Sequence, residues 1–402
     1  MSGVRRTFQV ALATLLGLVI TTLPVSAAEP PTHAFHKQTL WRSFTTGGMV
    51  TCFRLPAVAK TRNDVLLAFA ERRNGNNCHD HGPFDIVMRR SLDNGRTWEA
   101  SRTVLAGTAG AALQGHATVV ADSTGPVFLF STSEPTEARP WLPRTPKVQV
   151  SRDDGRTWSA PRDLSDVIKA PAGDQDWFAT GPGHGIQLTR GDHAGRLVVP
   201  VYFAVGGRQS VRLVYSDDHG ANWKIGATAT YDKSELQLGE QTLVERADGS
   251  ILVIARNGAV PNDTSIHGLA ESVSRDGGET FAGPFRADQA IVAPPTHPAL
   301  LRQRWDTAGY SRILLSAPAT PKTDNNAVGM NVRSSFDEGA TWRTYDNKVG
   351  NAGVRIDGDH AGYSDMTLIG NGAIGVLYEA GAARFRDEIR WNWFWESALG
   401  LP

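Results

Sequence analysis

Residues 78–81 place a thiol, two imidazoles and a carboxylate in direct succession, as Cys78-His79-Asp80-His81. Each of these side chains can bind a metal ion, and together they would suggest a zinc centre. Zinc takes tetrahedral ligands that are spaced along the chain, however, and four consecutive residues cannot close around one ion. The sequence therefore predicts no metal site here, and we expect that the protein needs no cofactor.

Five aspartates recur in nearly the same eight-residue context, S-x-D-x-G-x-T-W. They are Asp93, Asp153, Asp218, Asp276 and Asp337. A catalytic carboxylate would not be needed five times in one chain. An aspartate can instead accept backbone N–H groups two residues further on, and the glycine two positions later allows a positive φ. Because strand-like runs flank the octets, we predict that each aspartate shapes a hairpin turn.

The elements that carry these turns follow from their spacing. The octets begin at residues 91, 151, 216, 274 and 335, so the repeat is about 60 residues long. A near-constant period indicates one supersecondary unit copied along the chain. Sheets repeated radially form a β-propeller, with four strands in each blade. We therefore predict an all-β fold, a six-bladed β-propeller that extends over residues 38–400 as one domain.

The first residues of the chain are typical of a targeting segment. Arg5 and Arg6 precede an apolar run at residues 10–20, and Val25-Ser26-Ala27 fits a cleavage site. We therefore predict a secretory signal peptide at residues 1–28 and a secreted, extracellular protein without a membrane segment after cleavage. The paired arginines leave both the Sec and the Tat export routes open.

The net charge argues against nucleic acid as a partner. Without Arg5 and Arg6 the chain has 39 basic residues (41 − 2) against 41 acidic ones. Proteins that bind nucleic acid usually present a basic patch or a high isoelectric point.

Cys52 and Cys78 are the two cysteines of the sequence. Cysteines that are exported to an oxidising space can be joined in a disulfide. Both lie near the ends of strands or loops in the first repeat, so we favour a disulfide between them. Two buried thiols are the alternative.

Outside the octets, several segments resemble the exo-sialidases, the glycoside hydrolases that release terminal sialic acid. Residues 52–56, which read Cys-Phe-Arg-Leu-Pro, resemble the FRIP motif of that family. Segments resembling further motifs of the family follow in order at residues 66–98, 176–188, 239–257 and 362–381. The resemblance runs from about residue 40 to about residue 395 and implies a retaining exo-α-sialidase.

The resemblance assigns a carboxylate clamp to two arginines. Sialic acid carries a carboxylate on its anomeric carbon, and guanidinium groups bind carboxylates through two parallel hydrogen bonds. Arg54 and Arg256 match the first and second arginines of the family's triad. Glu379 matches the glutamate that orients the first of them.

The resemblance also implies the catalytic groups. A carboxylate nucleophile would be repelled by the substrate's own carboxylate, and sialidases use a tyrosine instead. Tyr363 matches that nucleophile, and Glu240 matches the partner that takes its proton. Asp80 matches the acid/base that protonates the leaving oxygen and later activates water. Asp85 is a competitor for this role, although it lies at the start of a predicted strand.

The sequence departs from the family at the third arginine of the triad. Aligned on Met330 and Arg333, the expected position falls on Ala327. Either another arginine fills in, with Arg302 and Arg312 as candidates, or the ligand is not an ordinary sialoside, or the activity is weakened.

We therefore expect a monomeric exo-α-sialidase that acts on sialylated glycans of glycoproteins, glycolipids and oligosaccharides. Two alternatives stay open: a propeller that binds an acidic sugar without cleaving it, and a glycosidase for a related 2-keto sugar acid. Trp177 and Phe178 could stack on a sugar or pack in the core. The linkage preference is not predicted.

Overall fold

The computed structural model describes residues 35–400, apart from residues 76–77, 81, 108–112, 135–142, 170–176, 206, 231–235, 259–267, 289–290, 292, 307–308, 320–327 and 344–352. The predicted signal peptide at residues 1–28 and the triad position Ala327 lie outside the described residues. Within the described ranges, no helix has both the length and the apolar character needed to cross a membrane.

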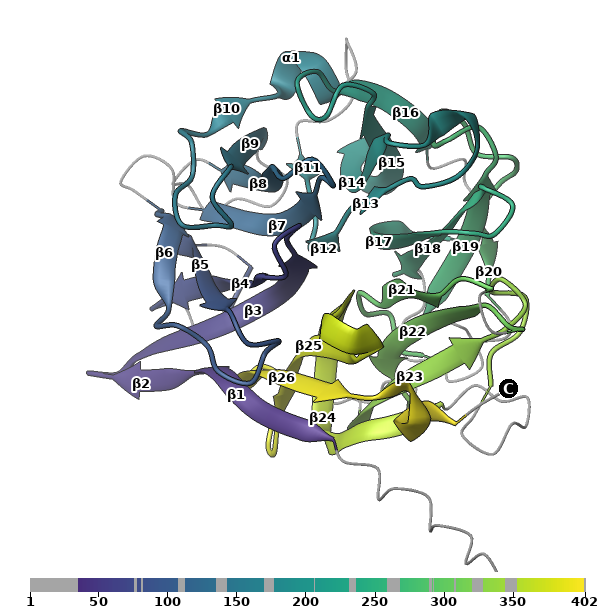
Figure 1. Cartoon of the computed structure of the whole chain (residues 1–402). Helices are drawn as coiled ribbons and strands as arrows, with labels where there is room; N and C mark the ends of the chain where they lie inside the picture. The colour runs from purple at the N-terminus through teal and green to yellow at the C-terminus, as the bar shows by residue number, and fades with distance from the viewer. Residues whose placement is uncertain are drawn as a thin grey trace, which may run out of the picture. The chain divides into compact units, whose positions relative to one another are not determined.

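The structure is built almost entirely from β-sheets, which Figure 1 shows arranged around a common centre. This is the arrangement of a β-propeller. The described residues contain one short α-helix, α1 (Ser165–Ile168), and short 3-10 turns at Gly191–His193, Gly370–Gly372 and Glu396–Leu399. The prediction of an all-β propeller is therefore confirmed.

In the described part of the chain the strands pair into five sheets. The first contains β2 (Phe44–Thr46), β3 (Met49–Lys60), β4 (Leu66–Asn74), β5 (Phe84–Ser91) and β6 (Arg102–Leu105). The second contains β7 (Leu113–Ala121), β8 (Val127–Glu134), β9 (Thr145–Ser151), β10 (Arg162–Asp163) and β12 (Gly183–His184). The third contains β11 (Phe178–Ala179), β13 (Ile186–Gln187), β14 (Leu197–Val205), β15 (Arg208–Ser216) and β16 (Lys224–Ala229).

The remaining strands form one small and one large sheet. The fourth sheet contains β17 (Leu238–Glu245), β18 (Ile251–Asn257), β19 (Leu269–Ser274) and β20 (Arg286–Ala287). The fifth contains β1 (His36–Arg42), β21 (Ala299–Arg304), β22 (Arg312–Pro318), β23 (Val328–Ser335), β24 (Val354–Leu368), β25 (Ile374–Gly381) and β26 (Glu388–Phe394).

Strand pairing among the described residues therefore gives five sheets, where we predicted six separate blades. The reason is the length of β24, which has 15 residues. Its first half pairs with β23, and its second half pairs with β25. One continuous strand thus joins two groups of strands into a single seven-stranded sheet.

The octets form the predicted hairpin turns, and their aspartates hold the turns closed. In the first octet, Asp93 Oδ1 accepts hydrogen bonds from Ser91 Oγ and from the Thr97 N–H, both at 2.8 Å. The serine Oγ in turn accepts the Gly95 N–H at 2.8 Å. The same bonds recur at Asp153, Asp218, Asp276 and Asp337. The aspartates are therefore structural, as predicted.

The glycine of the first octet is required by close packing as well as by the turn. Gly95 has φ +80°, and a Cβ there would lie 2.4 Å from Nε1 of Trp391. The indole of Trp391 is fully buried among apolar side chains of the first and fifth sheets. The turn of the first octet is thereby packed against the neighbouring fifth sheet.

Candidate active site

A cleft with a volume of about 330 Å³ opens at the centre of the sheets. A volume of this size suits a small ligand such as a single sugar. The lining residues include four arginines, two acids, two tyrosines and a tryptophan, namely Arg54, Arg73, Arg144, Arg256, Asp80, Glu240, Tyr202, Tyr363 and Trp177. The cleft is therefore polar and rich in positive charge.

Irregularities in the inner strands direct side chains into this cleft. The strand register shifts between Arg54 and Ala57 in β3, between Leu238 and Gln241 in β17, and between Ala361 and Ser364 in β24. Such bulges re-aim a side chain and are common next to active sites. Three residues singled out from the sequence, Arg54, Glu240 and Tyr363, lie at or within these bulges.

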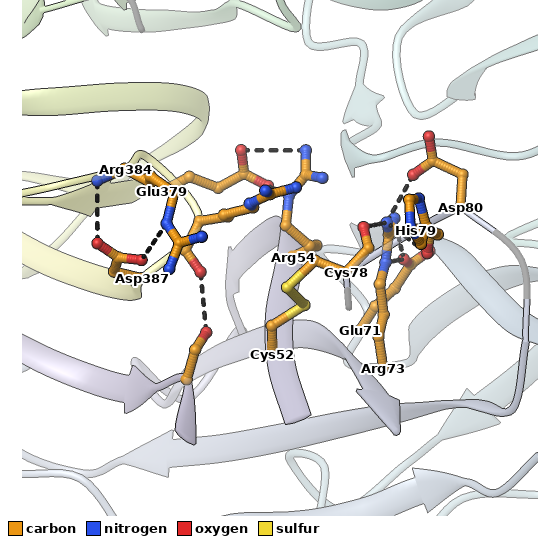
Figure 2. The surroundings of a disulfide bond; sticks show 12 residues. Cys52, Arg54, Glu71, Arg73, Cys78, His79, Asp80, Glu379, Arg384 and Asp387 are labelled. Carbon is orange, nitrogen blue, oxygen red and sulfur yellow. Dashed lines mark hydrogen bonds and ion pairs between the residues drawn. A yellow bond between two sulfur atoms is a disulfide. The ribbon is translucent and has the colours of Figure 1, made fainter. Parts of the chain in front are cut away.

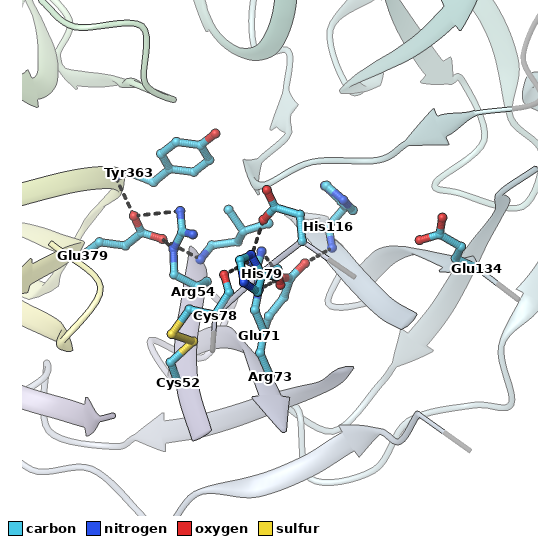
Figure 3. Close-up of polar contacts among 12 residues, drawn as sticks. Cys52, Arg54, Glu71, Arg73, Cys78, His79, His116, Glu134, Tyr363 and Glu379 are labelled. Atoms are coloured by element: carbon cyan, nitrogen blue, oxygen red, sulfur yellow. Dashed lines mark hydrogen bonds and ion pairs between the residues drawn. A yellow bond between two sulfur atoms is a disulfide. The ribbon is translucent and has the colours of Figure 1, made fainter. Parts of the chain in front are cut away.

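Glu379 holds Arg54 in place. Its Oε1 accepts hydrogen bonds from Arg54 Nε at 2.6 Å and from the Leu55 N–H at 3.0 Å. Its Oε2 accepts hydrogen bonds from Arg54 Nη2 at 3.3 Å and from the Tyr363 N–H at 3.2 Å. Glu379 is fully buried. A Cβ at Gly362 would lie 2.4 Å from Glu379 Oε2, so the carboxylate needs a glycine beside it. Figure 3 shows the guanidinium of Arg54 beside the carboxylate of Glu379, with the ring of Tyr363 above them.

Burial lowers the pKa of Arg54, but the charge and hydrogen bonds of Glu379 and the nearby Asp80 and Tyr363 together outweigh it, so the pKa lies above the ordinary value. Arg54 is therefore a permanent cation at the wall of the cleft. Two of its donors are used by Glu379, and the rest of its guanidinium can face a ligand.

Tyr363, Glu240 and Arg256 form a second hydrogen-bonded group. The Tyr363 hydroxyl donates to Glu240 Oε1 at 2.6 Å and accepts from Arg256 Nη1 at 2.8 Å. Arg256 Nη1 also lies 3.1 Å from both carboxylate oxygens of Glu240. Tyr363 and Glu240 are 9% and 6% exposed, respectively. A hydroxyl, a buried base and a cation thus converge on one point of the cleft.

The charge states in this group are set by burial and by the neighbouring charges. Burial and the Glu240 carboxylate raise the pKa of Tyr363 well above its usual value, although Arg256 opposes this. Burial would raise the pKa of Glu240, but the charge of Arg256 and the hydrogen bond from Tyr363, with smaller contributions, together lower it below its ordinary value, so Glu240 is ionised at neutral pH. The phenol is then protonated and directed at an anionic base, which is the arrangement of a nucleophile with its proton acceptor.

Asp80 lies at the mouth of the cleft, in the segment that follows β4. Its side chain is 78% exposed, and its Oδ1 accepts Arg73 Nη1 at 2.5 Å. Loss of surrounding water raises the pKa of Asp80, but the charges of Arg73 and Arg54 lower it below the ordinary value. Because the side chain is so exposed, solvent screens these charges, and the pair contributes little to stability.

Arg73 anchors the segment that carries Asp80. Its side chain is 2% exposed and donates to Glu71 Oε2 through Nε at 2.9 Å and through Nη2 at 2.8 Å. Its Nη1 also donates to the carbonyl oxygens of Cys78 at 3.1 Å and His79 at 3.2 Å. Arg73 therefore fixes the backbone on the N-terminal side of Asp80 as well as its carboxylate.

In the structure Cys52 and Cys78 form a disulfide, with their Cα atoms 5.8 Å apart. Figure 2 shows the bond between the strand of Arg54 and the segment of Asp80. The bond links a position two residues before Arg54 to one two residues before Asp80. It also removes Cys78 as a metal ligand, and no group of three metal-binding side chains occurs among the described residues.

The contacts of Asp85, Trp177 and Phe178 decide which of these residues can take part in the site. Asp85 is buried and is not among the residues that line the cleft. Its Oδ2 accepts a hydrogen bond from Arg72 Nη2 at 2.5 Å, and its Oδ1 accepts one from the Gly107 N–H at 2.9 Å. Asp85 therefore does not compete with Asp80. Trp177 lines the cleft with Arg144 over its ring at 4.6 Å, whereas Phe178 is buried in the core.

The candidates for the third arginine of the triad do not line the cleft. Arg302 donates to Glu338 and to the Glu245 carbonyl. Arg312 is fully buried and pairs with Glu396 at 3.0 Å. Both substitutes were therefore wrong, because each cation is held by a carboxylate outside the cleft.

Our sequence prediction missed several cleft residues. Arg73 follows Arg72 on β4, and only the alternation of a strand distinguishes the inward Arg73 from the outward Arg72. Arg144 is 3% exposed; its Nη2 donates to Glu134 Oε2 at 2.9 Å and its Nη1 lies 2.9 Å from His116 Nε2. No local sequence signal distinguishes Arg144 or His116 from surface residues.

Comparisons with known proteins identify the family of the chain. Residues 63–375 match the family described as BNR repeat-like domain. The chain is 32% identical to a sialidase of Micromonospora viridifaciens in an alignment 348 residues long, which covers 82% of this chain and 50% of that protein. It is 30% identical to an exo-alpha-sialidase of Aspergillus fumigatus in an alignment 403 residues long, gaps included, which covers 91% of each chain. The chain thus spans half of the first relative and nearly all of the second.

Solved structures share the fold. The intramolecular trans-sialidase from Ruminococcus gnavus has a TM-score of 0.71 at 19% identity, covering 87% of this chain and 96% of that chain. A Hadza microbial sialidase has a TM-score of 0.72 at 22% identity, covering 87% of this chain and 66% of that chain.

Proposed function

The chain belongs to the sialidase family of BNR-repeat glycoside hydrolases, and on this premise we propose that it is a retaining exo-α-sialidase. The observation that carries the proposal is the buried pair of Tyr363 and Glu240, 2.6 Å apart, beside the two cations Arg54 and Arg256. Its substrates are the terminal sialic acids of glycoproteins, glycolipids and oligosaccharides.

The arginines bind the substrate's carboxylate. Arg54 and Arg256 both line the cleft, and both are cations because a guanidinium group stays protonated at ordinary pH; Glu379 and Glu240 raise their pKa values further. A carboxylate between two guanidinium groups forms charge-assisted hydrogen bonds that also fix its orientation. This binding presents the anomeric carbon to the Tyr363 hydroxyl.

In the first step the Tyr363 oxygen attacks the anomeric carbon while Glu240 accepts the phenolic proton. The bond from that carbon to the leaving oxygen breaks, and Asp80 donates a proton to this oxygen. In the second step Asp80 takes a proton from water, the water oxygen attacks the anomeric carbon, and Tyr363 leaves and regains its proton from Glu240. Two inversions retain the anomeric configuration.

Asp80 must be protonated before it can act as the acid. In the free protein the charges of Arg73 and Arg54 favour its anion. A substrate carboxylate on Arg54 offsets one of these charges and adds a negative charge nearby, which raises the pKa of Asp80. Binding of substrate thereby prepares the acid.

The fold is proposed to be a six-bladed propeller in which β24 serves two blades. The support is the order of the inner strands: β3, β7, β14, β17, β21 and β24 contact one another in succession, and β24 contacts β3. Residues 38–400 would then form one domain of six units around the cleft.

The protein is proposed to be secreted as a monomer after removal of residues 1–28. The disulfide between Cys52 and Cys78 supports an oxidising destination. N-terminal sequencing of the exported protein tests this proposal, and a retained residue 1 in the extracellular fraction contradicts the cleavage.

The test of function is hydrolysis of a fluorogenic α-sialoside by the purified, folded chain. We expect release of the fluorophore, with α-sialic acid as the first product in the NMR spectrum. Folded protein that releases nothing at any pH rejects the proposal.

Binding of an acidic sugar without cleavage is the second candidate, because neither Arg302 nor Arg312 lines the cleft, and the other two lining arginines, Arg73 and Arg144, are paired with Glu71 and Glu134. Titration calorimetry with sialic acid and with deaminated 2-keto sugar acids separates the cases. Heat of binding without turnover of the matching glycoside supports the binding protein. Turnover of the deaminated glycoside alone indicates the related glycosidase.

A further inference from the structure

His297 is a buried residue directly behind the cleft that no step of the proposed mechanism uses. It is 1% exposed and follows Pro294, Pro295 and Thr296, which line the cleft. Its ring centroid lies 5.9 Å from that of Tyr363. On its other side, a Cβ at Gly183, which has φ +105°, would lie 2.8 Å from His297 Cε1. The imidazole therefore packs between β17, β24 and Gly183.

The ring faces one backbone carbonyl on each of two strands. Its Nε2 lies 3.2 Å from the Gln241 oxygen on β17, and its Nδ1 lies 3.2 Å from the Ser364 oxygen on β24. The His297 carbonyl also accepts the Ser364 N–H at 3.4 Å. Gln241 directly follows Glu240, and Ser364 directly follows Tyr363. One side chain thus contacts the backbone next to the base and the backbone next to the nucleophile.

We propose that His297 is a positioning residue, which ties β17 to β24 and so keeps Glu240 within hydrogen-bond distance of the Tyr363 hydroxyl. The inference rests on the proposed function and names a residue on which its rate depends. Both anchored residues lie at bulges, where the ladder hydrogen bonds that would otherwise fix them are interrupted. A link from outside the ladder replaces those bonds.

The strength of this link depends on the charge of the ring. A neutral imidazole has one N–H and can donate to one carbonyl, whereas the imidazolium donates to both. Burial lowers the pKa of His297 below its ordinary value, although the carboxylates of Asp365 and Glu240 oppose this. The other titratable groups on the packed strands are Tyr363 on β24 and His184 on β12, which bonds to Asp365 at 2.5 Å. The two strands are therefore tied most firmly at acidic pH.

The experiment compares the wild-type chain with His297→Leu, which cannot donate, and His297→Gln, which keeps donors at a similar reach. We expect kcat of His297→Leu to fall between about ten- and a hundredfold, as for a misaligned reacting pair. KM should stay within about twofold, because Arg54 and Arg256 are unaltered. His297→Gln should recover part of kcat. The control is His219→Leu: His219 lies in the turn of the third octet and bonds Asp122, outside the cleft lining.

The ratio of wild-type to His297→Leu kcat should rise as the pH falls, since ionisations shared by the two proteins cancel in that ratio. Nitrogen-15 NMR of the wild-type histidine rings, assigned by the signal missing in His297→Gln, should show both His297 nitrogens protonated on the acid side. This measurement needs no activity, so it separates a failure of this inference from a failure of the proposed function.

Three results overturn the inference. One is a kcat of His297→Leu within about twofold of wild type. Another is a parallel fall of kcat, 1/KM and melting temperature in both variants, which indicates a general structural role. The third is a kcat ratio that does not change with pH together with a ring that never carries two protons.

Discussion

The hydroxyl of Tyr363 lies 2.6 Å from Oε1 of Glu240, although the two residues are 123 positions apart in the chain. Arg256 Nη1 contacts both, at 2.8 Å from the hydroxyl and 3.1 Å from the carboxylate oxygens. The cation keeps Glu240 ionised, and the ionised carboxylate accepts the phenolic hydrogen bond. The proton acceptor of the proposed reaction is therefore in place before substrate binds.

Replacing the nucleophile should abolish turnover without unfolding the protein. We expect Tyr363→Phe to lower kcat by about a thousandfold or more, because the attacking oxygen is removed. Glu240→Gln should lower it by about 10²- to 10⁴-fold through loss of the base. Steady-state kinetics on a fluorogenic sialoside measure both effects. Tyr310→Phe, which loses a hydrogen bond to Glu396 outside the cleft lining, is the matched control and should retain wild-type kcat.

The role of Asp80 should appear as a dependence on the leaving group. In Asp80→Asn no proton can be donated, so natural glycosides with poor leaving groups should slow by about 10²- to 10⁴-fold. An aryl sialoside, whose leaving oxygen needs little protonation, should lose much less in its first step. Comparing kcat/KM for sialyllactose and for the aryl sialoside checks this. Equal losses on both substrates would assign Asp80 a role other than the acid.

Removing Glu379 should weaken both the fold and substrate binding. In Glu379→Ala the buried Arg54 keeps its charge without a partner, which costs about 3–5 kcal/mol of unfolding free energy. KM should rise at least about tenfold, since Arg54 is no longer oriented. Urea unfolding and steady-state kinetics measure the two quantities. The control is Glu396→Ala, which removes the carboxylate partner of the buried Arg312 outside the cleft. It should lower the free energy of unfolding and leave KM unchanged. A normal KM in Glu379→Ala contradicts the orienting role.

The disulfide should stabilise the fold and the position of Asp80. It closes a loop of 26 residues, for which loop entropy predicts about 3.5 kcal/mol. We expect the double variant Cys52→Ser, Cys78→Ser to lose about 2–4 kcal/mol in urea unfolding and to show a lower kcat. Peptide mapping without reductant verifies the bond in the wild type. Free thiols at both positions in the exported protein would refute it.

The aspartates of the octets should matter for stability and not for turnover. Hydrogen bonds from the Thr157 hydroxyl and N–H lower the pKa of Asp153 to about 2, from an ordinary value of 3.8. Because the folded pKa is lowered, the stabilisation is present above pH 3.8 and is lost as the pH falls through about 2. Asp153→Asn should therefore cost about 1 kcal/mol or less at pH 7 and nothing near pH 2. Urea unfolding at both pH values checks this, and kcat should be unchanged.

Local features of the sequence determined the turns and the repeat. The bonds of Asp93 to Ser91 and Thr97 span four residues or fewer, so the octet carries its own geometry wherever it is placed. The resemblance to sialidases singles out Arg54, Glu240 and Tyr363 from short motifs of the sequence. The structure brings these three residues to one cleft, and their roles in binding and catalysis are part of the proposed function.

The tertiary structure decided which charges share the cleft. Arg54 and Glu379 are 325 residues apart and meet only because β3 and β25 belong to neighbouring sheets. Arg302 and Arg312 were plausible from their position in the chain, yet each is held by a distant carboxylate. Arg73, Arg144 and His297 carry no local signal, because strand register and bulges set where their side chains point. The number of sheets likewise depended on one long strand, β24, that pairs on both sides.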